Sequence, residues 1–209
     1  MKTKFVAVIL GMALLGASGV ACAQFGGLGG KLSGVTGGSS SNVSPEAIVT
    51  KYVGGAQSVN KADVKMLRAV GLKEEADRAE LQAKNLTEGA TQGSLEDATK
   101  VQTDSSKALQ EKFASGKVEM DEKSKKQFAD GMVDLAHGLL AYVGMSKEAS
   151  GFKPAPTAIG SSTLSAAYVV KTLPDSIKSL GSTLKSSIDF AKTNNIPVPK
   201  EAADATSAI

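Results

Sequence analysis

The residues best suited to chemistry in this sequence surround its one histidine, His137. Asp130 and Asp134 precede it on the same predicted helix, so two carboxylates and an imidazole fall on adjacent turns. Helical bundles bind metal ions through acid-x-x-His pairs of this kind, and a histidine beside an acid can activate a serine nucleophile. The sequence thus raises two hypotheses: a metal site of Asp130, Asp134 and His137, and a cryptic hydrolase that uses His137.

Three features of the sequence count against the metal site, and the third also counts against the hydrolase. A di-metal bundle needs two such pairs, and the sequence has a single histidine. Aspartate also has a shorter reach than the glutamate that is usual in these sites. On a helical wheel Asp130, Asp134 and His137 lie opposite the apolar face of their helix, which predicts that they face water. We therefore expect no catalytic residue, no metal and no cofactor, in a protein that is not an enzyme.

Two glycines flank the apolar face of the same predicted helix. Gly131 and Gly138 are two turns apart, and each costs a helix about 1 kcal/mol relative to alanine, so the pair needs a structural reason. We favour close packing of a neighbouring helix against them. The alternative is a shallow groove at Gly131 and Gly138 that admits a partner helix or an elongated ligand.

The helix that carries these residues is the most regular one in the sequence. Asp121 is a favourable N-cap for it. Five apolar residues then recur at steps of three or four: Phe128, Met132, Leu135, Leu139 and Val143. Because such spacing places them within a narrow arc, we predict that this is the central core helix and that it ends before Ser150.

Apolar periodicity and helix caps predict further helices. Ser44-Pro45-Glu46 begins the first one, and Ser94 resembles the start of a capping box. Pro174 is expected to end one helix and begin the next; the apolar segment before it has a short strand as its alternative. The predicted segments are 44–59, 64–70, 73–88, 94–115, 162–173 and 174–191.

These elements predict an all-α bundle of about six helices, mostly antiparallel, in one domain over residues 44–197. Residues 24–43 are rich in glycine and serine, which predicts a flexible leader. Residues 198–209 are expected to form a loose C-terminal tail. Since the sequence has no tryptophan and only 4% aromatic residues, the core is expected to be aliphatic.

Residues 1–23 have the pattern of a secretory signal peptide. Lys2 and Lys4 precede an apolar run of about 16 residues, which is shorter than a bilayer-spanning helix. Ala21-Cys22-Ala23 matches the small-x-small pattern that signal peptidase cuts. Cleavage between Ala23 and Gln24 would deliver the protein to the periplasm of a Gram-negative envelope or to the exterior, with no membrane span in the mature chain.

The single cysteine, Cys22, supports a second interpretation. A lipoprotein signal ends at a cysteine that is lipidated and becomes the first residue of the mature chain. Gly19 stands where a leucine-like residue is usual, so the fit to that pattern is partial. In this alternative the protein is a structural envelope lipoprotein anchored through Cys22, with residues 24–43 as its tether, and it contacts a membrane only through the lipid.

The charge balance limits the class of partner. Loss of residues 1–23 takes the basic residues from 24 to 22, against 21 acidic residues. A chain so close to neutral has no overall field that would attract nucleic acid. The sequence therefore predicts an exported, non-enzymatic helical protein that acts by binding a protein partner or a small apolar ligand.

Overall fold

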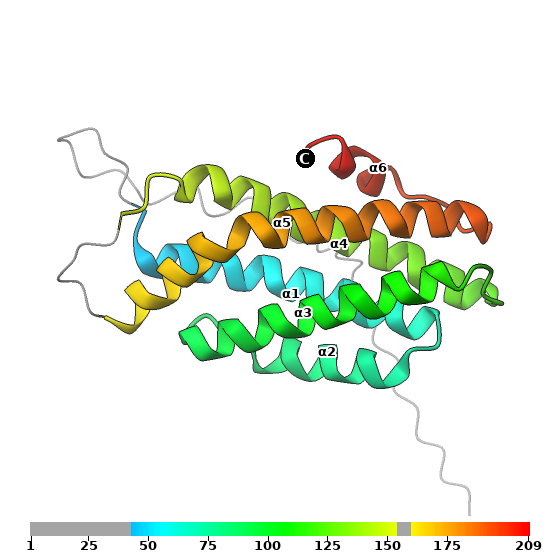
Figure 1. Ribbon diagram of the computed structural model, residues 1–209, viewed down its shortest axis with the longest axis horizontal. Coiled ribbons are helices and arrows are strands. Elements are labelled where there is room, and N and C mark those ends of the chain that lie inside the picture. The colour runs from blue at the N-terminus through cyan, green and yellow to red at the C-terminus, as the bar shows by residue number, and fades with distance from the viewer. Residues whose placement is uncertain (1–42, 154–159) are drawn as a thin grey trace, which may run out of the picture. The chain divides into compact units, whose positions relative to one another are not determined.

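The computed structural model describes residues 43–153 and 160–209. In these residues the chain forms helices and no strand, and consecutive helices from α1 to α5 run in opposite directions (Figure 1). The predicted all-α bundle of about six mostly antiparallel helices is confirmed. The helices are α1 (Pro45–Ala69), α2 (Lys73–Asn85), α3 (Gln92–Ala114), α4 (Glu122–Ala149), α5 (Ser161–Thr193) and α6 (Lys200–Thr206).

Helix α1 begins as predicted but is longer. The Ser44 hydroxyl accepts a hydrogen bond from the Ala47 amide at 3.2 Å, with proline at the first position of the helix. The helix then continues through Gly54 and Gly55 to Ala69, where the sequence predicted two segments. One face of α1 is buried along its whole length, and this burial offsets the low helix propensity of the two glycines.

Helix α3 begins earlier than predicted. Its N-cap is Thr91, whose hydroxyl accepts a hydrogen bond from the Ser94 amide at 3.4 Å. The predicted cap at Ser94 is therefore wrong, and Ser94 lies within the first turn. Both residue types are good caps, so composition did not distinguish the two positions.

Helix α5 is continuous where the sequence predicted a break at Pro174, and the segment 162–173 is helix rather than strand. Proline inside a helix removes one backbone hydrogen bond and costs about 3 kcal/mol. Pro174 is exposed, whereas Leu173 and Leu180 on either side of it are buried in the same core. Packing of both halves against the bundle thus maintains one helix, whose first part is inclined to the second (Figure 1).

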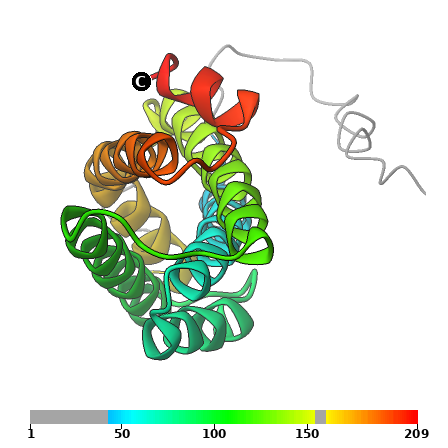
Figure 2. The same ribbon diagram turned by 90° about the vertical axis from the view of Figure 1, so that its right-hand side faces the viewer.

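The C-terminal segment differs from the expected loose tail. Residues 200–206 form α6, which packs on α4 and α5 and buries Ala202 and Ala205 completely. Seen end-on, α6 lies outside the bundle over these two helices (Figure 2). Two small alanines in so short a segment give no distinct apolar stripe, which explains why the sequence did not indicate a helix here.

The contact between α1 and α4 is the most extensive in the bundle. A Cβ atom on Gly138 would lie 2.6 Å from Cγ2 of Val59 and 3.2 Å from the Gly55 carbonyl oxygen. A Cβ atom on Gly131 would likewise lie 2.6 Å from Cγ of Met66. Close packing at Gly131 and Gly138 is therefore what the structure shows, and the groove interpretation of these glycines is wrong because α1 fills the space.

The contact has the same character at its other end. A Cβ atom on Gly55 of α1 would lie 2.6 Å from the ring of Tyr142 on α4. Tyr142 in turn stacks on Tyr52, with ring centroids 5.0 Å apart. Glycines of each helix thus face larger side chains of the other: Gly138 faces Val59, Gly131 faces Met66, and Gly55 faces Tyr142.

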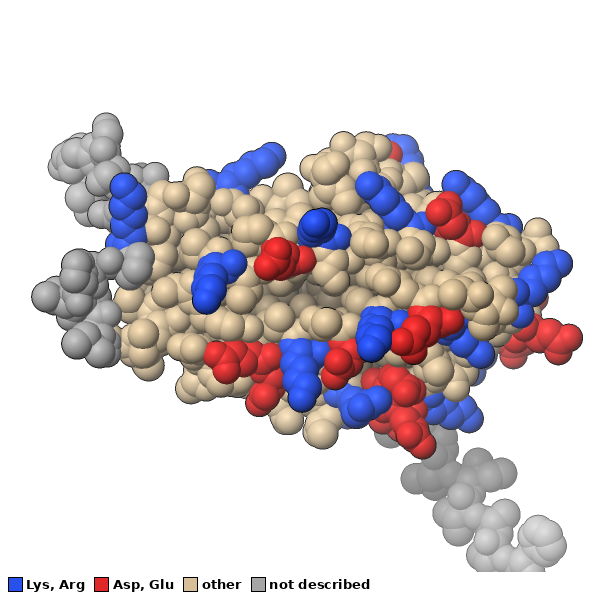
Figure 3. Space-filling view, in the orientation of Figure 1, with Lys and Arg blue, Asp and Glu red and all other residues tan. Residues whose placement is uncertain are grey.

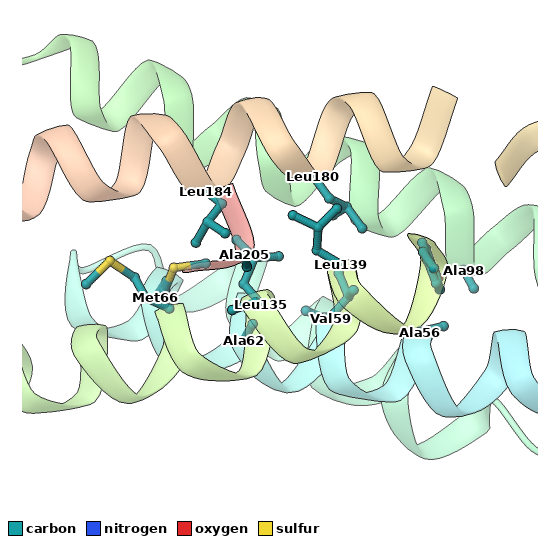
Figure 4. Packing of buried hydrophobic residues seen from close by; sticks show 14 of the residues in the cluster. Ala56, Val59, Ala62, Met66, Ala98, Leu135, Leu139, Leu180, Leu184 and Ala205 are labelled. Carbon is teal, nitrogen blue, oxygen red and sulfur yellow. The ribbon is translucent and has the colours of Figure 1, made fainter. Parts of the chain in front are cut away.

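Helix α4 presents its leucines to α5. Leu135 and Leu139 of α4 point toward Leu180 and Leu184 of α5, and all four are buried (Figure 4). The core is mostly aliphatic, as expected from the composition, but it also contains an aromatic cluster. Phe113, Phe128 and Phe190 come from three helices, with centroids 4.6–5.8 Å apart.

The tightness of the α1–α4 contact is tested by alanine at Gly138. We expect Gly138→Ala to lower the free energy of unfolding by about 1–3 kcal/mol, because the new methyl group overlaps Val59 and the α1 backbone. Gly144→Ala is the matched control on the same helix, where nothing lies within 4 Å, and it should raise stability by up to about 1 kcal/mol. Urea unfolding measures both, and equal stabilisation by the two substitutions would contradict the packing described.

Candidate functional site

The polar residues that the sequence singled out on α4 do not form a joint site. His137 is exposed and forms no hydrogen bond with another residue in the described ranges. Asp130 lies 2.9 Å from the Lys126 ammonium, and Asp134 lies 2.7 Å from that of Lys65 on α1. Each carboxylate therefore has its own lysine.

Among residues 43–153 and 160–209, no three acidic, histidine or cysteine side chains gather closely enough to hold a metal ion. Nor does a described contact give His137 the nucleophile and acid that a hydrolase requires. The predictions for Ala23, Gln24 and Cys22 lie outside the described residues. None of the described helices has the length and apolarity needed to cross a membrane.

A groove of about 600 Å³ lies between α4 and α5, next to the residues that follow α6. This volume falls within the range of about 300–1,000 Å³ that is usual for small-molecule sites. The residues that line this α4–α5 groove are Val143, Ser146, Lys147, Pro174, Ile177, Lys178, Gly181, Ser182, Lys185, Ala208 and Ile209. Its walls are mostly apolar, and its charged members are all lysines.

Small side chains on α5 make room for the groove. Gly181 and Ser182 lie between Lys178 and Lys185, and the side chain of Ile209 lies directly over Gly181. A Cβ atom on Gly181 would collide with the end of that isoleucine and with no other atom outside its own helix. The groove thus already holds one aliphatic group against its floor, although Ile209 remains 46% exposed.

The lysines of the groove carry charge that no neighbour compensates. Lys147, Lys178 and Lys185 are exposed, and none forms an ion pair with a described residue. No acidic residue lines the groove. Figure 3 shows lysines spaced along the exposed side of α5, with single acidic residues between them.

The sequence contains a signal of this surface, although none of the predicted sites includes it. Lysines recur every seven residues along α5, at 171, 178, 185 and 192, and a seven-residue step returns to nearly the same side of a helix. The predicted break at Pro174 separated Lys171 from the other three lysines, whereas Lys178 and Lys185 fall within one predicted segment. Lys147 and Ile209 belong to other segments, so their place beside it depends on the tertiary fold.

A second unusual feature lies inside the bundle. Asn60 and Asp63 of α1 are completely buried, and none of their side-chain nitrogen or oxygen atoms has a hydrogen-bond partner among the described residues. The helices packed on α1 also bury polar side chains, and these come from both α3 and α5. They are Gln102, Ser105, Ser106, Ser165, Thr183 and Ser187.

Burial changes the proton affinity of two groups in this interior. Loss of solvation raises the pKa of the Asp63 carboxyl well above its usual range, and no positive charge nearby opposes the effect. The pKa of Tyr142 is also raised, first by burial and then by the nearby Tyr52 and Asp63. The Tyr142 hydroxyl accepts a hydrogen bond from Gln102 at 3.4 Å. The interior thus favours a protonated, neutral Asp63.

Comparison of the chain with protein-family models, with curated proteins and with solved structures found no match. Functional inference therefore rests on the sequence and on the shape and chemistry of the groove and of the buried polar interior.

The buried carboxyl predicts a pH-dependent stability. Above about pH 4 the Asp63 carboxyl ionises in the unfolded chain but keeps its proton in the fold, so the stability of the wild type falls as the pH rises. Asp63→Asn removes this proton. We expect the variant to gain stability over the wild type by up to about 1 kcal/mol for each pH unit above pH 4.

Urea unfolding between pH 4 and pH 8 measures this difference. Asp104→Asn, which replaces an exposed carboxylate on α3, is the control and should leave the pH dependence unchanged. A constant difference between Asp63→Asn and the wild type across that range would show that the carboxyl ionises freely in the fold.

Proposed function

We propose that this protein acts by binding rather than by catalysis, and that the α4–α5 groove holds a small, elongated apolar ligand. The observation that carries this proposal is the groove itself, with its volume of about 600 Å³ and its walls of Val143, Pro174 and Ile177. A ligand that covered these side chains would gain about 25 cal/mol for each Å² of apolar surface removed from water.

The position of Ile209 supports an aliphatic occupant. Its side chain lies over Gly181, where the absence of a Cβ atom leaves room for it. Because Ile209 is still half exposed, it fills only part of the groove and forms a weak contact. An aliphatic chain could replace it against the same floor and extend along the rest of the groove.

We further propose that residues 1–23 direct export, so that the protein acts in the periplasm or outside the cell. The support for this is the sequence pattern of two lysines, an apolar run and Ala21-Cys22-Ala23. The alternative, an envelope lipoprotein, is supported by Cys22 and by the glycine- and serine-rich residues that follow it. Both leave residues 43–209 outside the cytoplasm.

Occupation of the groove is tested by filling it. A Cβ atom at Gly181 meets only the flexible end of Ile209 outside its own helix, so we expect Gly181→Leu to fold and to occupy part of the space of the ligand. We expect the wild type to bind the neutral apolar dye N-phenyl-1-naphthylamine, with enhanced fluorescence, and Gly181→Leu to weaken this binding at least about tenfold, since a buried leucine contributes about 2 kcal/mol.

The matched control is Gly54→Leu, a helical glycine with nothing within 4 Å and outside the groove lining. It makes the same change in helix propensity and should bind the dye like the wild type. Thermal unfolding followed by circular dichroism verifies that both variants fold. The proposal fails if the wild type does not bind the dye, or if folded Gly181→Leu binds it equally well.

The two processing alternatives differ in the mass of the mature chain. Expression of the full sequence in a Gram-negative host, followed by intact-mass spectrometry, should give a chain that begins at Gln24 if Ala23 is the cleavage site. A diacylglyceryl adduct on Cys22 would instead establish the lipoprotein. Cys22→Ala is the control, because the variant can still be cleaved after Ala23 but cannot be lipidated.

A further inference from the structure

We infer that the ligand of the α4–α5 groove is a long-chain carboxylate, with its aliphatic chain along Val143, Ile177 and Gly181 and its head group between Lys147, Lys178 and Lys185. The inference rests on the proposed function, because it assigns a ligand class to the same groove. It also assigns the three lysines as the residues that select for a negative head group.

The first argument is charge. Three lysine ammonium groups line the groove, no acidic side chain lines it, and none of the three lysines has an ion-pair partner among the described residues. The nearest acidic residues lie outside the lining: Glu148 pairs with Lys51, Asp189 lies 3.9 Å from Lys192, and Asp175 is exposed beside Pro174. A single negative charge placed here would therefore meet lysine side chains and no acidic side chain of the lining.

The second argument is geometry. Lys178 and Lys185 are two turns apart on α5, which separates their backbones by about 10 Å along the helix. Lys147 stands across the groove on α4, so the three long side chains can converge on one head group. Ser146 and Ser182 line the same stretch, and their hydroxyls can donate further hydrogen bonds to a carboxylate.

The third argument is the juxtaposition of these charges with an aliphatic floor. A neutral apolar ligand would cover the aliphatic floor of the groove. It would also remove water from the lysine ammonium groups without supplying a negative charge, and this desolvation is unfavourable. A polar anion such as phosphate would leave Val143, Ile177 and Gly181 uncovered. An aliphatic carboxylate satisfies both parts of the groove, with its chain in the place of the Ile209 side chain.

The test compares a carboxylate with its neutral ester. Dodecanoate and methyl dodecanoate are each used to displace N-phenyl-1-naphthylamine from the wild-type protein. We expect dodecanoate to bind at least about tenfold more tightly than the ester, since an exposed ion pair contributes up to about fivefold and three lysines act together. Its affinity should fall as salt rises, while that of the ester should not.

Charge reversal then locates the effect. Lys178→Glu and Lys185→Glu should each weaken dodecanoate binding about tenfold, by removing attraction and adding repulsion, and should leave binding of the neutral dye unchanged. Lys171→Glu is the matched control, because Lys171 is an exposed lysine two turns before Lys178 on the same helix and does not line the groove. It should bind dodecanoate like the wild type.

The outcomes separate this inference from the proposed function. Equal affinity for dodecanoate and its ester, with dye binding intact, overturns the assignment of a carboxylate and leaves an apolar groove. An equal loss in Lys171→Glu also overturns it, because the attraction would then be general rather than located at the groove. Absence of binding by the dye and by both amphiphiles overturns the proposed function itself.

Discussion

The close approach of α1 and α4 determines the arrangement of the other helices. Gly131 and Gly138 allow the backbone of α1 to come near that of α4, and Gly55 does the same for Tyr142. Because one side of α4 packs against α1, Leu135 and Leu139 on its other side face α5. Val143 and Lys147 lie farther along α4, at the edge of the α4–α5 contact. The groove lies on the side of α4 that faces α5, where the contact between helices is less extensive than that between α1 and α4.

The same contact places α1 among four neighbouring helices, so that water reaches it mainly along one face, at Thr50, Gly54, Lys61 and Arg68. Asn60 and Asp63 are buried as a consequence, and neither is compensated by hydrogen bonds within the described residues. Buried polar groups without partners each cost about 1–3 kcal/mol. The glycine contact, the Tyr52–Tyr142 stack and the phenylalanine cluster must supply enough packing energy to offset this cost.

Sequence reasoning succeeded where local physics agrees with the tertiary fold. Ser44 and Asp121 cap helices as predicted because a cap depends on residues three or four positions away. The reasoning failed at Pro174, where burial on both sides outweighs the cost of proline. It also failed for α6, whose two buried alanines matter only because α4 and α5 lie beneath them.

The candidate site was still harder to predict, for a related reason. The glycine pair on α4 was correctly expected to pack against a helix, but nothing local identified α1 as that helix. The groove needs residues from α4, from the second half of α5 and from the segment after α6. Only the lysine row on α5 was visible in the sequence, and its place beside a groove depends on Lys147 of α4 and on Ile209, which only the tertiary fold brings to it.

The electrostatics of the groove also constrain the kind of ligand. With residues 1–23 removed, 22 basic residues stand against 21 acidic ones, so long-range attraction of a polyanion is weak. The positive charge that matters is local, carried by three lysines around an apolar hollow. At physiological ionic strength such charges act over about 8 Å, so they act on a head group that lies in the groove and only weakly on one that is farther away. The groove therefore selects its ligand by direct contact. It favours a ligand that carries one negative charge beside an aliphatic chain over a ligand that lacks either part.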